Sequence, residues 1–166
     1  MQALQAGSMA PDFTLTATDG GSIHLLELLQ HGPVVLAFFK VSCPVCQFAF
    51  PYYERLAQAH NHTGVTVLGI CQNSEGEAVA FAGEYGVTFA LAIDNDSNGY
   101  AVSNAYGLTN VPTIFYITQS GEIEVSSVGW SKAELDDVNV RLSTRGEAQA
   151  SSLWRDGEEV PVFRAG

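Results

Sequence analysis

The sequence contains few cysteines, few basic residues and no long apolar run. Three cysteines in 166 residues are too few for a fold held together by disulfides, and they suit a redox protein better. Seven Lys and Arg against 18 Asp and Glu give a formal net charge of −11, which argues against nucleic acid or an anionic membrane surface as a partner. Up to Trp130 the only basic residues are Lys40 and Arg55, and we interpret the acidic remainder as a solvated surface.

No stretch of the sequence has the length and hydropathy of a membrane span or a signal peptide. Residues 1–9 (MQALQAGSM) have neither a basic region nor an apolar run. We therefore expect no membrane partner and a cytoplasmic location, or a periplasmic or membrane-anchored one if a leader has been lost. A hydrophobic fraction of 46% is enough to bury one full core, which predicts a single domain.

The candidate active site is Cys43-Pro44-Val45-Cys46, which follows the apolar run at residues 34–39 and opens a helical pattern. A thiol at a helix N-terminus lies beside unpaired N–H groups and the positive end of the helix dipole, which favour the thiolate. We therefore predict Cys43 as the exposed nucleophile and Cys46, three residues on, as the resolving thiol. Pro44 suits the first helical turn because its fixed φ presets the helix.

Other roles of the cysteine pair are less well supported. A closed zinc site usually needs four ligands, but the only other cysteine is Cys71, and the sequence has no second CxxC and no HxxxH. Haem attachment needs a His directly after the second cysteine, where Gln47 stands. A purely structural disulfide over so short a loop would remove little entropy from the unfolded chain. We therefore predict no metal and no cofactor.

The first half of the sequence predicts a β-hairpin, two buried strands and an extra α-β unit. Asp12–Thr18 alternates apolar and polar residues, and an Asp-Gly-Gly turn leads back into Ser22–Leu25. The unbroken apolar run at 34–39 is typical of a strand buried on both faces, and residues 65–70 predict a second apolar strand. After the second run, residues 74–93 predict a helix and a short strand.

The helical pattern at residues 47–59 is amphipathic. Phe48, Tyr52, Leu56 and Ala59 recur at a spacing of three and four residues. We expect these four side chains to form the buried side of the helix.

The second half of the sequence predicts, in order, a helix, two strands and a closing helix, over residues 98–106, 113–117, 123–128 and 131–142. From Ser143 the pattern fades. We therefore predict a domain over residues 1–142 and a tail over residues 143–166. The tail is either a flexible arm or a segment that packs back on the domain or on a partner.

Together these motifs resemble the thioredoxin-like proteins, and within them the branch of the TlpA/ResA-type thiol-disulfide oxidoreductases and the related AhpC/TSA group. The resemblance covers about residues 11–138 and is carried by Pro11–Leu15, Cys43–Cys46, Pro51, Tyr106–Leu108, Val111–Thr113 and Gly129. It implies an α/β fold: a three-layer sandwich whose mixed central sheet is flanked by helices, with an N-terminal β-hairpin and one inserted α-β unit.

The resemblance also implies a role for Val111 and Pro112, and the residues next to the cysteines suggest further roles. In the family, the proline that aligns with Pro112 is cis and faces the CxxC, and the backbone of the preceding residue pairs with the substrate. Carried over, Val111 and Pro112 form the docking edge for an extended substrate segment. Lys40, just before the motif, would stabilise the thiolate, or it extends into solvent. Pro44 and Val45, between the cysteines, would tune the thiolate as well.

Four positions depart from the family pattern. Many thioredoxins carry a buried Asp six residues before the first cysteine, where it helps proton transfer to the inner thiol, but this chain has Ala37. Ser42 replaces the Trp commonly found before the first cysteine, and Pro-Val replaces the Gly-Pro of a typical reducing thioredoxin. The sequence therefore leaves open how the inner thiol is deprotonated and which way electrons flow.

The function we predict is thiol-disulfide exchange with protein disulfides, with an upstream dithiol as electron donor or acceptor. Reduction of the substrate is the expected direction, because cytoplasmic thiols are kept reduced. One alternative is an antioxidant peroxidase of the AhpC/TSA kind, although the PxxxTxxC pattern of those enzymes precedes neither Cys43 nor Cys46. Another is a binding module in which both thiolates and a His hold copper(I) or zinc.

Three further features have ordinary structural explanations. Cys71 ends a predicted strand, and we interpret it as a small buried hydrophobe rather than a third redox thiol. His60 and His62 form an HxH pattern in a polar turn, where we expect them to be exposed and unliganded. Asp94–Gly99 resembles the start of a calcium loop, but Ala105 replaces the bidentate Glu, so we predict a turn and a helix cap.

Overall fold

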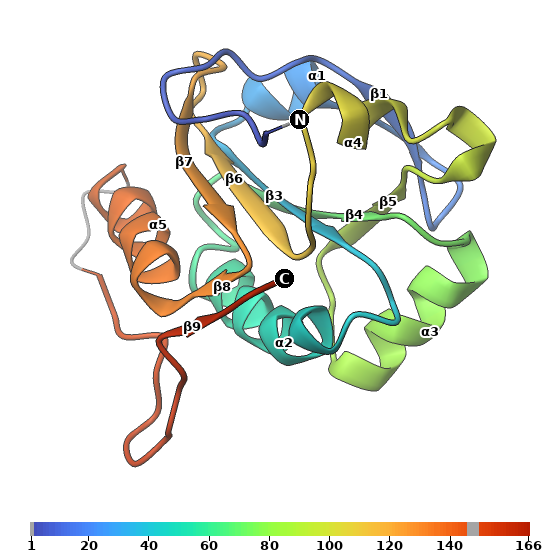
Figure 1. The fold of residues 1–166 in the computed structure, drawn as a ribbon. Coiled ribbons are helices and arrows are strands. Elements are labelled where there is room, and N and C mark those ends of the chain that lie inside the picture. The colour runs from blue at the N-terminus through green and yellow to red at the C-terminus, as the bar shows by residue number, and fades with distance from the viewer. Residues whose placement is uncertain (1, 146–149) are drawn as a thin grey trace.

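The computed structural model describes residues 2–145 and 150–166 and has helices on both faces of one mixed sheet (Figure 1). Seven strands form this sheet in the order β2-β1-β5-β4-β3-β6-β7. The strands are β1 (Thr14–Ala17), β2 (Ser22–His24), β3 (Val34–Phe39), β4 (Thr66–Cys71), β5 (Ala90–Ile93), β6 (Thr113–Ile117) and β7 (Ile123–Val128). The helices are α1 (Leu25–Leu29), α2 (Pro44–Ala59), α3 (Glu75–Tyr85), α4 (Ala101–Ala105) and α5 (Lys132–Arg145). A second, two-stranded sheet joins β8 (Trp130–Ser131) to β9 (Phe163–Arg164).

The hairpin and the inserted unit are both present where the sequence predicts them. Strands β1 and β2 pair antiparallel, and α3 leads into β5, which pairs parallel with β4. Strand β5 also pairs antiparallel with β1, so the inserted unit joins the hairpin to the rest of the sheet. The predicted α/β sandwich with a mixed sheet is therefore confirmed.

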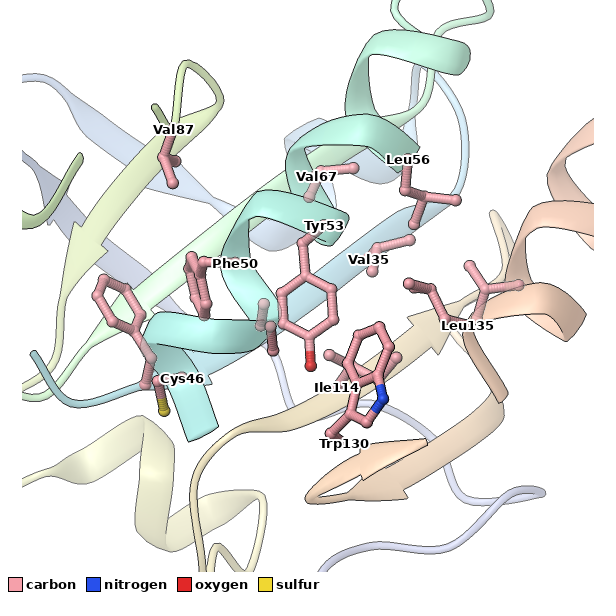
Figure 2. Packing of buried hydrophobic residues seen from close by; sticks show 14 of the residues in the cluster. Val35, Cys46, Phe50, Tyr53, Leu56, Val67, Val87, Ile114, Trp130 and Leu135 are labelled. Atoms are coloured by element: carbon pink, nitrogen blue, oxygen red, sulfur yellow. The ribbon is translucent and has the colours of Figure 1, made fainter. Parts of the chain in front are cut away.

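The central strand β3 is buried along its whole length because helices cover both faces of the sheet. Helices α2, α3 and α5 contribute to one hydrophobic cluster, and α1 and α4 contribute to the other. Figure 2 shows Cys46, Phe50, Tyr53 and Leu56 on the inner face of α2, directed toward the sheet. Helix α2 is thus fixed by its own buried side chains.

The predicted buried side of α2 is only partly correct. Leu56 is buried, but Ala59 is exposed and Phe48 and Tyr52 are half-buried. The two aromatic rings pack on Trp130, at centroid distances of 5.2 and 5.1 Å, rather than on the sheet. Helix α2 therefore has two apolar faces: an inner face on the sheet and an outer face on Trp130. The sequence pattern identified the outer face.

The later elements differ from prediction at their ends. Helix α5 continues to Arg145, three residues past the predicted end of the domain at residue 142. Of the predicted tail, residues 146–149 lie outside the described residues, while Arg55 pairs with Glu158 at 2.7 Å and so holds the later part on α2. Among the described residues, no helix combines the length and the hydropathy needed to cross a membrane.

The predicted cap at Asp94–Gly99 is present, and Asp94 is its centre. Asp94 is fully buried and its carboxylate accepts four hydrogen bonds: from the Asn98 side chain, the Val102 N–H, and the N–H and hydroxyl of Ser103. A shorter helix than predicted, α4, begins there after a 3₁₀ turn at Asp96–Asn98.

Replacement of this carboxylate is expected to destabilise the fold strongly. An Asp94→Ala variant leaves several buried donors without an acceptor, so we expect its free energy of unfolding to fall by about 3 kcal/mol. The exposed neighbour provides the matched control, because Asp96→Ala should change stability by no more than about 0.5 kcal/mol. Urea unfolding of both variants measures the difference, and equal midpoints would contradict this role of Asp94.

Candidate functional site

The first cysteine of the CxxC lies at the point where the central strand gives way to α2. Cys43 is the N-cap of α2, in an extended backbone conformation, and Pro44 occupies the first turn, as predicted. The backbone N–H of Cys46 donates to the Cys43 Sγ at 3.2 Å. Cys43 is half-buried, and its sulfur faces this N–H in the first turn of the helix. The sulfur therefore lies beside the first N–H groups of α2, at the positive end of the helix dipole.

The loop between β3 and Cys43 is held by side chains that sequence analysis did not identify. The Asn73 side-chain oxygen accepts a hydrogen bond from the Val41 N–H at 2.9 Å, and the Gln47 amide donates to the Val41 carbonyl at 2.8 Å. Asn95 in turn donates to the carbonyl of Asn73 at 3.1 Å. These contacts join distant parts of the chain, and no local motif marks them.

The second cysteine is fully buried. Burial raises the pKa of the Cys46 thiol far above its ordinary value, and the hydrogen bond to Cys43 raises it further, while a backbone contact with Lys40 lowers it. Ala37, where many thioredoxins have an acid, is buried in the same hydrophobic cluster. Cys46 is therefore a neutral thiol in the reduced protein at neutral pH.

The predicted docking residues lie directly against Cys43. The Cys43 thiol donates to the Val111 carbonyl at 3.4 Å, although the two residues are 68 positions apart. The Val111–Pro112 peptide bond is cis, and the Pro112 carbonyl accepts from the Gly129 N–H at 2.7 Å. Strand β6, next to β3 in the sheet, brings Val111 and Pro112 to the edge where α2 begins.

A polar cavity adjoins this edge. It has a volume of about 410 Å³ and includes Lys40 and Val111 in its wall. The other lining residues are mostly amides and hydroxyls: Gln72, Tyr100, Ser103, Asn104, Leu108, Thr109 and Asn110. Lys40 is exposed, and Val45 is half-buried against the core cluster. Their effect on the thiolate remains a prediction.

The remaining sequence candidates lie away from the CxxC chemistry or inside the core. Cys71 is buried, and burial raises the pKa of its thiol to about 11. His60 is buried rather than exposed, which corrects the prediction, because its Nε2 bonds the Asn139 side chain at 2.8 Å. Within residues 2–145 and 150–166, no three His, Cys, Asp or Glu side chains gather as a metal site would require.

The geometry supplies the parts needed for dithiol exchange. An accessible thiol at a helix N-terminus can attack a disulfide, and a buried thiol one turn away can resolve the product. Val111, beside them, is half-buried, and an extended chain can hydrogen bond to its backbone.

Comparisons with known proteins agree with this arrangement. The sequence model of the AhpC/TSA family matches residues 6–126. The thiol-disulfide oxidoreductase ResA of Halalkalibacterium halodurans is 35% identical over 120 residues, which cover 72% of this chain and 66% of that protein. ResA of Geobacillus thermodenitrificans is 32% identical over 143 residues, which cover 86% of this chain and 79% of that protein. The chain thus spans about two thirds to four fifths of the length of these relatives.

Solved structures share the fold. The thioredoxin domain of a thiol-disulfide oxidoreductase from Bacteroides vulgatus superposes with a TM-score of 0.73 at 20% identity, covering 82% of this chain and 96% of that one. A thiol:disulfide interchange protein from Bacteroides sp. gives a TM-score of 0.73 at 20% identity, covering 83% and 90%. At this identity the likeness establishes the thioredoxin-like fold alone.

Proposed function

The chain belongs to the AhpC/TSA family, in its TlpA/ResA-type thioredoxin-like branch, and from this premise we propose that it is a thiol-disulfide oxidoreductase that acts on protein disulfides. One observation carries the assignment of residues: the Cys43 sulfur lies between the N-terminus of α2 and the Val111 carbonyl. The nucleophile and the docking edge are therefore adjacent.

The proposed reaction has two exchange steps. The Cys43 thiolate attacks one sulfur of the substrate disulfide; a Cys43–substrate disulfide forms, the substrate S–S bond breaks, and one substrate thiolate leaves and takes a proton from solvent. Cys46 then loses its proton and attacks the Cys43 Sγ. The Cys43–Cys46 disulfide forms and the second substrate thiolate leaves. Two electrons pass from the dithiol to the substrate, and an upstream dithiol returns them.

Docking of the substrate is proposed to use the Val111–Pro112 edge. An extended segment next to the substrate cysteine would hydrogen bond to the backbone of Val111, as an added strand does at a sheet edge. The neighbouring polar cavity, with Lys40 in its wall, would receive a side chain of that segment. Reduction of the substrate is the direction we propose, on the basis of the compartment expected from the sequence.

The test is turnover of a protein disulfide. The reduced chain, recycled with dithiothreitol, is expected to accelerate insulin reduction well above the dithiothreitol background, and to consume hydrogen peroxide no faster than a free thiol does. The peroxide result separates this proposal from the peroxidases of the same family. Rapid peroxide consumption without insulin turnover would reverse the assignment.

The pH dependence of resolution follows from the burial of Cys46. In the mixed disulfide Cys43 no longer has a thiol, but burial, the main cause of the raised Cys46 pKa, persists. Below that pKa the thiolate fraction rises about tenfold per pH unit, so the rate of the second step should rise by about a hundredfold between pH 6 and pH 8. Single-turnover kinetics of substrate release measure it. A flat profile would mean that a proton acceptor assists Cys46.

A further inference from the structure

The segment after residue 150 is anchored on the outer face of α2. Arg55 makes a two-pronged ion pair with Glu158, at 2.8 and 2.7 Å, and also donates to the Leu153 carbonyl. This pairing lowers the pKa of the Glu158 carboxyl to about 2. The Trp154 ring lies against Tyr52, with centroids 5.6 Å apart. The half-buried aromatic face of α2 is thus the support on which the tail rests.

Beyond this anchor, contacts with β8 and α2 direct the chain toward the active site. The Trp130 indole N–H donates to the Pro161 carbonyl at 2.7 Å, and β9 then pairs antiparallel with β8. The Arg164 guanidinium lies 4.2 Å from the centroid of the Phe48 ring. Gly129 has a φ of +80°, and a Cβ there would lie 2.6 Å from the Arg164 carbonyl, so the close approach of the tail requires glycine at this position.

The tail ends on the docking edge itself. The Asn110 side chain donates to the Gly166 carbonyl at 3.2 Å, and a Cβ on Gly166 would collide with the Val111 carbonyl. That same carbonyl accepts the Cys43 thiol. Figure 1 shows the C-terminus beside the loop that leads into β6, close to the start of α2. A substrate strand that pairs with Val111 would occupy the space that Gly166 occupies in this structure. The two cannot be there at the same time.

We propose that the C-terminal segment, residues 162–166, is an intramolecular competitor that occupies the docking edge until a protein substrate displaces it. The inference rests on the proposed function, because it takes Val111 as the substrate-docking residue. The attachment suits displacement: β9 has only two residues, and the Val162 and Phe163 side chains are 75% and 60% exposed. The Arg55–Glu158 anchor keeps the released segment near the site, so it competes at a high effective concentration.

The segment is expected to affect protein disulfides and small disulfides differently. A protein disulfide must displace the segment in order to pair with Val111, whereas a small disulfide reaches the Cys43 sulfur without that pairing. The apparent KM equals the intrinsic KM divided by the fraction of molecules whose site is open, so blocking about two thirds of the molecules raises it about threefold. The segment is therefore expected to raise KM for protein substrates and to leave kcat and the reaction with small disulfides unchanged.

The experiment compares the full chain with a variant truncated after Pro161, which keeps the Trp130–Pro161 hydrogen bond and the Arg55–Glu158 pair. We expect KM for insulin to fall by about threefold or more, and kcat/KM for bis(2-hydroxyethyl) disulfide to change by less than about twofold. A synthetic peptide of residues 160–166 should raise the KM of the truncated protein again. Thermal unfolding checks that the truncated chain folds.

Two point variants avoid a shortened chain. Arg164→Ala removes the contact with Phe48 and should lower KM for insulin in the same direction, while Val162→Ala, at an exposed side chain, should leave KM unchanged. If the full chain reduced neither disulfide, the proposed function would fall and this inference with it. If the full chain reduced both disulfides, while truncation and Arg164→Ala left KM for insulin unchanged or raised it, only the inference would be overturned. The segment would then not compete with the substrate.

Discussion

A Cys43→Ser variant is expected to lose insulin reduction by about a thousandfold or more, to the level of the dithiothreitol background. A serine hydroxyl stays protonated at neutral pH and forms no disulfide, so both exchange steps are lost. The substitution keeps the extended N-cap conformation, because serine is itself a favourable N-cap residue. The variant should therefore fold normally but have no activity above the background.

The matched control for this variant is the third cysteine. Cys71 is buried in β4, where burial raises its pKa to about 11, and it has no part in the proposed exchange. A Cys71→Ala variant should keep most of its insulin turnover per folded molecule. If Cys43→Ser kept more than about a tenth of the activity, or if Cys71→Ala lost it as completely, the assignment of the nucleophile would be wrong.

A Cys46→Ser variant is expected to stop after the first step and to accumulate a covalent complex with its substrate. Cys43 keeps its place at the helix terminus and attacks as before, but no thiol one turn away resolves the product. Almost every active molecule should then carry one substrate chain in the absence of added thiol. Mass spectrometry of the unreduced sample measures the adduct and the residue that holds it.

The double variant Cys43→Ser/Cys46→Ser is the control for trapping through Cys71, and it should form no complex. A complex held by Cys71 in either variant would give that residue a redox role that its burial does not predict. Rapid turnover by Cys46→Ser without a trapped complex would instead show that an external thiol resolves the intermediate.

Sequence analysis predicted the features that depend on local pattern. The hairpin of β1 and β2, the unbroken central strand and the thiol at a helix start all follow from neighbouring residues, and the structure contains each of them. The mixed central sheet flanked by helices came from the resemblance to a family. The meeting of Cys43 with Val111, across 68 positions, could be predicted only in that way.

The features that could not be predicted from the sequence depend on contacts between residues far apart in the chain. His60 looked like a surface residue, because its buried partner Asn139 lies 79 positions away. The stripe formed by Phe48 and Tyr52 was correctly recognised as apolar, but its partners are Trp130 and the tail rather than the sheet. The spacing of apolar residues shows that a helix has an apolar face, but it does not identify the later segment of the chain that covers this face.

The tail shows the same limit most clearly. Its sequence fades into small and polar residues after Ser143, so the pattern allowed both a flexible arm and a packed one. The contact of Gly166 with the docking edge depends on the pairing of β8 with β9 and on the glycine at position 129. Gly129 contributed to the sequence analysis only through the family resemblance, and the structure shows that the backbone approaching it is that of the chain's own tail.

The central claim, that Cys43 and Cys46 exchange electrons as one dithiol pair, is tested most directly by a redox titration of the full chain. Samples equilibrated in defined thiol/disulfide buffers are alkylated and mapped by mass spectrometry. We expect one two-electron transition that forms only the Cys43–Cys46 disulfide, with a midpoint near or below about −230 mV for a reductant. A midpoint above about −180 mV would reverse the proposed direction. The absence of a Cys43–Cys46 disulfide at every potential would contradict the account itself.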